Sequence, residues 1–416
     1  MNKQSFINRH PVWFIIILTF SIRLISIWLI PVPLQDGGNF VLYHNVALDL
    51  LQGQGFSGEN YLAPAWPLLM AGMYFLFGTS LKVLFVLQIV FGVLLATLTY
   101  HLAGLLFGRR AAFLSGTVAA LWPGLILLTF SIGETTLLNA VFFLLGLVLL
   151  FRAIQNSSYW LVILSGLVFG AAALTDSIGL YLPAVIVIWY VLKYLLPKRE
   201  RFDKKGFRQL PLFLVFIAVF AATIFPWAYR NLQVFEFNSD APVIVKGIER
   251  TILQKEGFTE FVKAYHPAKL PTLTNGVIQL FFVPYKLDLL DTYTETSYKA
   301  VFWRLLQGQP LAISRQEGFI FILKIIISVA NVLLVIMAFW GLLKFKLKTQ
   351  SSLVVLLLAY TSFATLGYGA ATGYRGISPL GGFLVPYLPV LISFAVFALV
   401  GLSDRGEFED DTHAVK

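Results

Sequence analysis

Long apolar runs separated by short basic clusters restrict this chain more than any other feature. A helix needs about 20 mostly apolar residues to cross a bilayer, and about ten runs approach that length. The predicted spans are 12–30, 80–106, 112–129, 137–151, 159–174, 180–196, 210–229, 319–343, 353–368 and 378–402. Only 12% of the residues are charged, against about a quarter in soluble proteins. We therefore expect an all-α polytopic membrane protein.

The basic clusters predict which way the helices cross the membrane. Lys and Arg collect in cytoplasmic loops, and every basic cluster here falls on one side of the predicted spans, the strongest at 197–205. This arrangement explains the formal net charge of +10 without nucleic acid as a partner. The first run lacks a small-residue cleavage site, which favours a retained helix. We expect a protein of the inner (cytoplasmic) cell membrane with both termini cytoplasmic.

Three regions follow from this topology. Residues 1–229 form an N-terminal transmembrane module that contains a first external loop, 31–80. Residues 230–318 form one long external loop, whose charges are nearly balanced in sign. Residues 319–416 hold the last helices and an acidic cytoplasmic tail.

The first external loop combines a carboxylate with two short helices. Residues 40–52 mix apolar and polar positions in a way that suits a helix in the membrane interface, and 64–77 are apolar but too short to cross. Asp36 precedes both helices, just outside the first span. A carboxylate there can act as a general base. Asp36-Gly-Gly is also a strong turn signal, and the residues alone leave catalysis and a turn equally supported.

The first loop resembles that of a known superfamily. An acid after the first span, then Tyr-x-x-x-Ala-x-x-Leu-x-x-Gly-x-Gly-Phe-Ser from Tyr43, then a Pro-flanked aromatic stretch ending at Gly78, is similar to the GT-C glycosyltransferases. The branch most like it is glycosyltransferase family 39 and its relatives, the protein O-mannosyltransferases and aminoarabinose transferases. The resemblance implies a GT-C-like helical bundle with Asp36 as the catalytic acid of the loop. Many relatives carry two adjacent acids here, whereas Gly37 follows Asp36 in this chain.

The resemblance also implies the substrates. The donor would be a monosaccharide on a polyprenyl phosphate, entering from the membrane. The acceptor would be a protein, a lipid or a glycan, and transfer would be a single inverting displacement. The donor is a substrate, and no cofactor follows from the sequence.

Glu134 is the second candidate catalytic residue. It lies where the span 112–129 emerges and the span 137–151 begins, in an apolar context where exposure to lipid is costly. It can orient the acceptor, or it can be a helix N-terminal acid favoured by the macrodipole. Relatives carry an acid at the same exit, which favours a functional role.

Arg230 and Arg375 are candidates to bind the donor phosphate. A guanidinium is permanently charged and matches phosphate oxygens with two donors. Both arginines are predicted on the outer side, against the positive-inside trend. An interfacial Arg can also snorkel or bind any lipid headgroup. The resemblance favours Arg375, because relatives end in Arg-Tyr-x-x-Pro-x-x-Pro and this chain has Tyr374-Arg375-Gly-Ile-Ser-Pro379.

Tyr43 and His44 follow Asp36 closely and are candidates to line the site, although interfacial aromatic residues are more often membrane anchors. Asp176 is interpreted as a helix cap in an external turn. The five histidines are scattered without metal-ligand spacing, and the chain has no cysteine. No metal site is predicted, and a divalent-metal requirement stays open.

The prediction is an integral membrane glycosyltransferase that is active on the extracytoplasmic side. One alternative is a glycan polymerase or ligase that uses undecaprenyl-linked sugars, since 230–318 contain Arg250, His266, Arg304 and Arg315. Another is a transporter or flippase for a lipid-linked solute, which would place charged residues near mid-span. The ionisable residues are interpreted as gathering at span ends, which disfavours the transporter. A non-catalytic scaffold is a third alternative.

Overall fold

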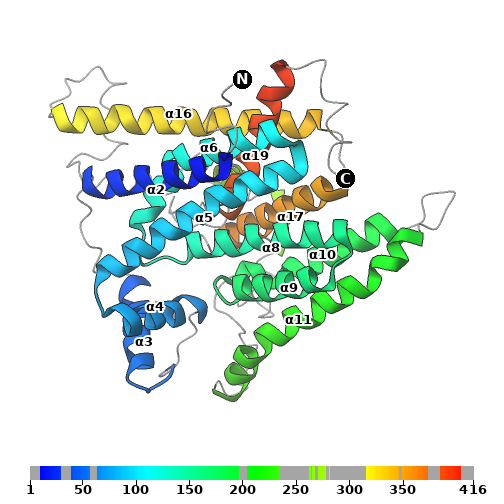
Figure 1. The fold of residues 1–416 in the computed structure, drawn as a ribbon, viewed down its shortest axis with the longest axis horizontal. Helices are drawn as coiled ribbons and strands as arrows, with labels where there is room; N and C mark the ends of the chain where they lie inside the picture. Colours follow the sequence, from blue (N-terminus) through cyan, green and yellow to red (C-terminus); the bar gives the residue numbers. More distant parts are fainter. Residues whose placement is uncertain are drawn as a thin grey trace, which may run out of the picture.

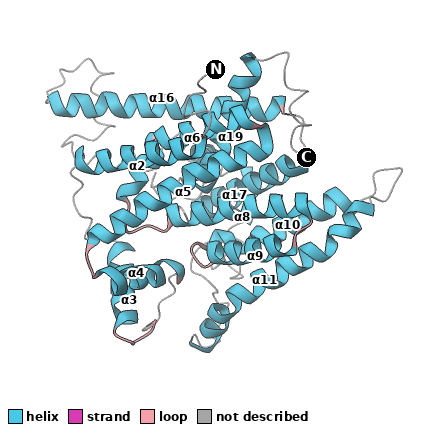
Figure 2. Cartoon of the chain, viewed as in Figure 1, coloured by secondary structure: helices cyan, strands magenta, loops and turns pink. Residues whose placement is uncertain are grey.

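The structure, a computed structural model, describes residues 10–29, 39–56, 63–195, 204–234, 262–263, 265–267, 270–277, 281, 315–345, 349–372 and 385–403. Within these ranges every regular element is a helix and none is a strand (Figure 2). The predicted all-α class is therefore confirmed. Most of the segment 230–318, which the sequence predicts as a long external loop, lies outside the described residues.

The helices follow one another with short connections. The N-terminal half contains α2 (Pro11–Leu29), α3 (Asn39–Leu51), α4 (Ala65–Phe77), α5 (Leu81–Phe107), α6 (Arg109–Leu121), α7 (Pro123–Leu127), the 3-10 turn η1 (Leu128–Phe130), α8 (Thr136–Asn156), α9 (Tyr159–Ala173), the 3-10 turn η2 (Ser177–Tyr181), α10 (Leu182–Tyr190), the π-helical turn η3 (Val191–Leu195) and α11 (Lys204–Val234). The C-terminal half contains α14 (Leu270–Val277), α16 (Arg315–Lys344), α17 (Thr349–Thr372), the 3-10 turn η7 (Val385–Tyr387) and α19 (Leu388–Ser403).

Five of the described helices, α2, α5, α8, α11 and α16, are long and apolar enough to cross a membrane. The number rises to six if the pair formed by α6 and the segment Pro123–Phe130, bent by 52°, is one broken span. The other predicted spans coincide with helices whose apolar parts are shorter. The positions of the spans therefore agree with the sequence prediction, whereas the count of about ten is not confirmed.

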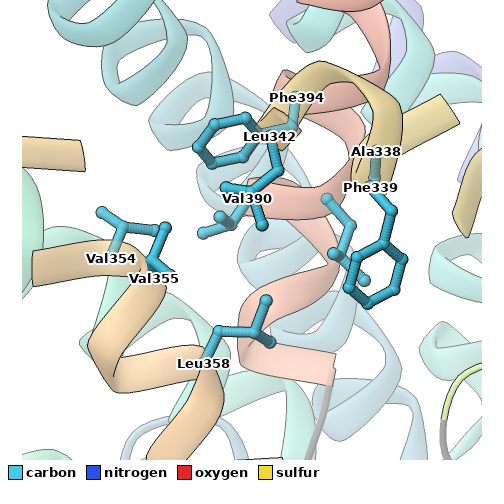
Figure 3. Close-up of a pocket in the computed structure, with 9 residues that line it drawn as sticks. Ala338, Phe339, Leu342, Val354, Val355, Leu358, Val390 and Phe394 are labelled. Carbon is cyan, nitrogen blue, oxygen red and sulfur yellow. The ribbon is translucent and has the colours of Figure 1, made fainter. Parts of the chain in front are cut away.

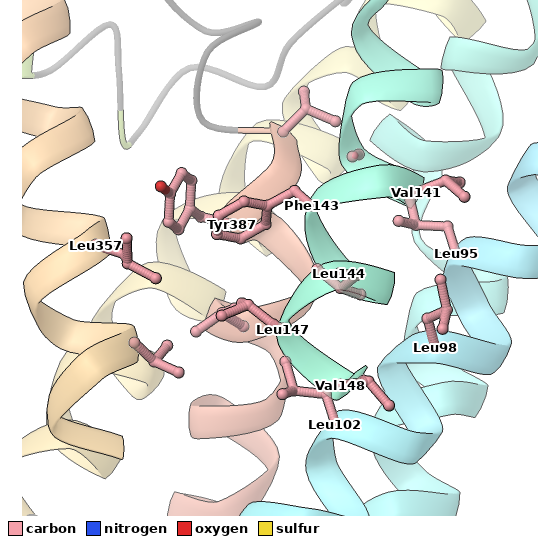
Figure 4. Close-up of a cluster of buried hydrophobic side chains, with 14 of the residues drawn as sticks. Leu95, Leu98, Leu102, Val141, Phe143, Leu144, Leu147, Val148, Leu357 and Tyr387 are labelled. Atoms are coloured by element: carbon pink, nitrogen blue, oxygen red, sulfur yellow. The ribbon is translucent and has the colours of Figure 1, made fainter. Parts of the chain in front are cut away.

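The core of the bundle is built where α5 and α8 face each other. In Figure 4, Leu95, Leu98 and Leu102 of α5 project toward Val141 and Val148 of α8, and all are buried. The α5 positions recur at intervals of three and four residues and the α8 positions are seven residues apart, which places each set on one face of its helix. Lipid tails are as apolar as these side chains, so the hydrophobic effect does not drive helices together inside a membrane. Close packing of this kind has to supply the free energy of association.

Small residues bring α9 close to α11. Gly166 and Gly170 are four residues apart, on one face of α9. A Cβ built on Gly166 would lie 3.1 Å from the Cβ of Val219, and one on Gly170 would lie 2.6 Å from the Cβ of Thr223. Small residues with this spacing let two helix backbones approach in membranes. The two glycines therefore set how tightly α11 docks against the bundle.

An apolar hollow lies between α16, α17 and α19 (Figure 3). Its lining is purely hydrocarbon and aromatic: Ala338, Phe339, Leu342, Val354, Val355, Leu358, Val390, Leu391 and Phe394. None of the predicted site residues lines it. A lining without polar groups suits a lipid tail better than a sugar, so we place the functional site elsewhere.

The helices α3 and α4 pack against each other as a pair at one end of the bundle, at lower left in Figure 1. Their positions match the two short helices predicted for residues 40–52 and 64–77. We call this region, where α3 and α4 meet the turns between the longer helices, the α3 end. It brings together most of the predicted site residues that the structure describes.

Candidate functional site

The turn that carries Glu134 lies directly against the start of α3. A Cβ built on Gly133 would lie 2.5 Å from the Cβ and 2.9 Å from the Cα of Phe40, so only a glycine allows this approach. Glu134 is half-buried, and its N–H donates to the carbonyl of Ser131 at 3.2 Å. Helix α8 begins two residues later, at Thr136. The carboxylate is therefore near both α3 and the positive end of α8.

The turn that carries Asp176 lies against the start of α4. The N–H of Asp176 donates to the carbonyl of Ala172 at 2.9 Å, which ends α9. Two residues before Asp176, the carbonyl of Leu174 accepts a hydrogen bond from the N–H of Ala65, at 3.1 Å. The second acidic turn is therefore tied to the first external segment, as the Glu134 turn is.

Tyr43 is close enough to both acidic turns for their charges to act on it. Its side chain is buried at 8% exposure, three residues after Phe40 and so on the same face of α3. Burial raises the pKa of Tyr43 well above its ordinary value, and the negative charges of Asp176 and Glu134 raise it further. The phenol therefore stays protonated and can donate a hydrogen bond at neutral pH.

His44 joins α3 to α4. Its Nδ1 and the hydroxyl of Tyr74 are 2.9 Å apart in a hydrogen bond, and its ring stacks on Phe40 with centroids 5.4 Å apart. These contacts give His44 a structural role that matches the anchoring interpretation. A direct role at the substrate stays a prediction.

Arg230, near the end of α11, binds the segment that follows α3 through hydrogen bonds and ring contacts. Its Nη2 donates to the carbonyl of Phe56 and its Nη1 donates to Oδ1 of Asn231, both at 2.9 Å. Its guanidinium lies 4.8 Å from the ring of Trp227 and 5.9 Å from the ring of Phe56. Arg230 therefore fixes the first external segment to α11. A role at the donor phosphate stays a prediction.

Replacing Arg230 with lysine is expected to loosen these contacts, because an ammonium cannot reproduce two directed donors and a stacked plane. The chain has no cysteine, so a single cysteine in place of Ala63, which is 7% exposed and packs with Trp227 and Phe56, is labelled only when this segment opens. Its maleimide labelling should be faster by about tenfold in Arg230→Lys, as expected for the loss of two charge-assisted hydrogen bonds. Arg152→Lys, an exposed position on α8, is the matched control. Equal labelling rates in the two variants would contradict this role of Arg230.

Two predicted residues, Asp36 and Arg375, lie outside the described residues. Their roles therefore remain predictions. Asp36 precedes Phe40 by four residues in the sequence, and Phe40 is the residue that meets the Glu134 turn.

The sequence interpretation missed two features of the described residues. Asp176, interpreted as a helix cap, lies close enough to Tyr43 to affect its titration. Its position at a span exit, which is also the position of Glu134, was the sequence pattern that could have identified it as a site residue. The expectation that ionisable residues gather at span ends is wrong at two positions. Arg23 in α2 is 0% exposed and lies five residues before the end of its candidate span. Lys324 in α16 is 4% exposed and lies six residues after the start of its span. Burial against neighbouring helices makes them tolerable there.

Among the described residues no group of three or more His, Asp or Glu side chains is arranged to hold a metal ion. The side chains that meet at the α3 end are carboxylates, a neutral phenol and a guanidinium. They can accept a proton, donate hydrogen bonds and bind an anion, respectively.

Comparison with known proteins gives a family for part of the chain. A model of the family "Dolichyl-phosphate-mannose-protein mannosyltransferase" matches residues 62–227. The matched segment contains α4 and both acidic turns of the α3 end. No curated protein sequence matches the chain significantly.

Solved structures give the fold. The oligosaccharyltransferase of Archaeoglobus fulgidus, tethered with an acceptor peptide, is 16% identical, with a TM-score of 0.61 over 97% of this chain and 51% of that one. Its apo form has a TM-score of 0.62 at 12% identity, over 99% of this chain and 52% of that one. ArnT from Cupriavidus metallidurans, bound to undecaprenyl phosphate, is 14% identical over 92% of this chain and 76% of that one, with a TM-score of 0.42. The chain thus spans about half the length of the first structures it matches.

The chain has the fold of the GT-C membrane glycosyltransferases, an all-α bundle with apolar spans. The resemblance to family 39 and its relatives, drawn from the first loop, is confirmed by the family match over residues 62–227. The family match supports a transferase, and the solved structures show the fold alone.

Proposed function

We propose that this protein is an integral membrane glycosyltransferase that moves a monosaccharide from a polyprenyl-phosphate donor to an acceptor at the α3 end. The observation that supports the proposal best is that both acidic turns contact the first external segment, at Phe40 and at Ala65, and that their charges act on the buried Tyr43. The acidic residues Glu134 and Asp176, from two separate turns between helices, are therefore both near the first external segment, which also contains Asp36. The α3 end is, in this proposal, extracytoplasmic.

In the proposed reaction Asp36 acts as the general base. As the acceptor hydroxyl or amine attacks the anomeric carbon, its proton passes to the Asp36 carboxylate. The bond between the anomeric carbon and the phosphate oxygen breaks, and the polyprenyl phosphate leaves with the electron pair. The leaving group is already an anion that needs no general acid, so one carboxylate suffices and the configuration inverts.

The remaining residues bind and orient the substrates. Glu134, next to Phe40, orients the acceptor, and the neutral phenol of Tyr43 donates a hydrogen bond to the sugar. Arg375 binds the donor phosphate. Arg230 already uses two of its donors to hold Phe56 and Asn231. Its proposed role is therefore to keep the site in its folded shape and to attract the phosphate from a distance by its charge.

A structural neighbour supports the class of donor. The Archaeoglobus fulgidus oligosaccharyltransferase AglB was solved with an inhibitory peptide and a dolichol-phosphate, at a TM-score of 0.60 to this chain. The family matched by residues 62–227 is named for a dolichyl-phosphate-linked mannose donor. A polyprenyl phosphate that carries one sugar is consistent with both.

The test is a donor panel with purified, reconstituted protein. Polyprenyl phosphates that carry different single sugars, and polyprenyl pyrophosphates that carry oligosaccharides, are supplied with peptide, lipid and glycan acceptors. The release of free polyprenyl phosphate or pyrophosphate is measured. We expect one donor to be consumed, with the sugar recovered on one acceptor class. Consumption of only pyrophosphate-linked oligosaccharides would favour the polymerase or ligase alternative.

The buried Arg23 and Lys324 favour a second candidate, a transporter or flippase for a lipid-linked solute. Ionisable residues inside spans are a feature of such pathways. The same reconstituted protein distinguishes the two candidates. A flippase moves a fluorescent lipid-linked sugar across the vesicle without breaking the sugar–phosphate bond, whereas a transferase breaks that bond.

A further inference from the structure

Arg23 is the most unusual buried group in the described part of the chain. It lies five residues before the end of the candidate span Pro11–Trp28 by sequence register and is 0% exposed. A charged guanidinium inside a membrane protein is costly unless protein groups surround it. Neither the family resemblance nor the proposed reaction uses Arg23, so its burial needs its own explanation.

The guanidinium of Arg23 reaches the place where the third predicted span breaks. Its Nη2 donates to the carbonyl of Leu125 in α7, at 3.2 Å. Helix α7 passes into the 3-10 turn η1 at Leu128, and carbonyls at such a change lose their regular helical partner. Arg23 supplies a donor at this point and ties α2 to α7.

A glycine of α5 makes room for this side chain. A Cβ built on Gly92 would lie 2.0 Å from Nε and 2.6 Å from Cζ of Arg23. The guanidinium therefore lies flat on the α5 backbone, and any other residue at position 92 would displace it. Gln88 lies one turn earlier on the same face of α5.

Gln88 holds the next part of the same connection. Its side chain is 1% exposed, and its Nε2 donates to the carbonyl of Ser131 at 3.2 Å. The same carbonyl accepts the N–H of Glu134, also at 3.2 Å. The side chain of Gln88 and the backbone N–H of Glu134 therefore share one acceptor, the carbonyl oxygen of Ser131.

Unused donors and acceptors are concentrated around these two side chains. Among the described residues, the buried atoms without a hydrogen-bond partner include Nε and Nη1 of Arg23, Oε1 of Gln88, Oγ1 of Thr129 and Oγ of Ser131. The guanidinium donors belong to α2, the amide acceptor belongs to α5, and the two hydroxyls, which can donate or accept, belong to η1 and the residue that follows it. Groups of opposite character that share one buried region can pair directly or through water.

We infer that Arg23 and Gln88 are positioning residues that fix the segment from Leu125 to Glu134 in its position relative to α3. Arg23 fixes the broken helix at Leu125, and Gln88 fixes the turn at Ser131. Gly133 then meets Phe40, and Glu134 faces the α3 end. The effect on catalysis rests on the proposed function, whereas the effect on the position of the turn does not.

The first experiment measures the turn without any activity assay. Because the chain has no cysteine, a spin label on a single cysteine at Thr135 reports the mobility of the Glu134 turn. Arg23→Met and Gln88→Met, which remove the donors at similar side-chain size, should each increase the mobility of the label. Thr19→Val is the control, because Thr19 is also buried in α2 but bonds only its own helix, at Ile15. An unchanged label in Gln88→Met overturns the inference even where Arg23→Met fails to insert.

The second experiment separates positioning from general destabilisation. In the transfer assay each variant should lower kcat by at least about tenfold with KM nearly unchanged, since small misplacements of a catalytic group are expensive. In a Glu134→Gln background the same variants should have little further effect on kcat, because the group that they position has gone. Equal losses in both backgrounds would overturn the catalytic consequence. An absence of transfer in the parent protein would refute the proposed function and leave the label result to decide the positioning.

Discussion

Asp36→Asn is expected to lower the rate of sugar transfer by at least about 100-fold, the usual contribution of a general base. The amide has the size of the carboxylate but cannot accept the proton of the acceptor at neutral pH. Expression, membrane insertion and donor binding should be retained, because Asp36 is proposed to act only as the bond forms. The measurement is kcat with purified variant and a saturating donor.

Asp49→Asn is the matched control for Asp36. Asp49 is a carboxylate of the same external segment, on α3, and has no assigned catalytic role. Its variant should transfer sugar at nearly the parent rate. Near-normal transfer by Asp36→Asn would remove the catalytic assignment of Asp36, and equal losses in the two variants would indicate a general effect of charge in the loop.

Gly133→Ala is expected to lower transfer by at least about tenfold. The added Cβ would lie 2.5 Å from the Cβ and 2.9 Å from the Cα of Phe40. Because these are backbone and near-backbone atoms, α3 or the Glu134 turn has to move as a unit. Glu134 then leaves its position relative to the first external segment. The measurement is kcat together with the mobility of a label at Thr135.

Gly72→Ala is the control for Gly133→Ala. Gly72 lies in α4, and a Cβ there would meet no atom within 4 Å, so this variant should keep its activity and gain slightly in helix stability. Phe40→Ala should not restore Gly133→Ala, since the clash involves atoms that alanine keeps. Parent-like transfer by Gly133→Ala would show that the contact with Phe40 does not position Glu134.

The long helices could be predicted closely because their signal is local. The expected spans 12–30 and 80–106 correspond to α2 and α5, each displaced by one residue. The span 112–129 was predicted as one helix, yet it bends by 52° between Leu121 and Pro123. Apolar composition measures how well a segment partitions into lipid and carries no information about the direction of its axis. Proline is common at the first position of a helix, but Pro123 is recognised as the start of a new helix only after the structure shows the break.

The candidate site divides in the same way. The types of residue at the span exits, among them Glu134 and Arg230, were visible because charged groups stand out in apolar sequence. Their partners were not visible. Arg230 meets Phe56, 174 residues earlier in the chain, and no periodicity along one segment reports a contact of that range.

The helical class, the apolar spans and the similarity to the GT-C glycosyltransferases could all be predicted from the sequence, because hydrophobicity and a short motif are properties of contiguous residues. The proximity of Asp176 to Tyr43 and the burial of Arg23 against Gly92 could be learned from the folded chain alone. Whether a charged side chain inside an apolar run faces lipid or protein depends on which helix packs against it. That choice is made by contacts between segments distant in the sequence.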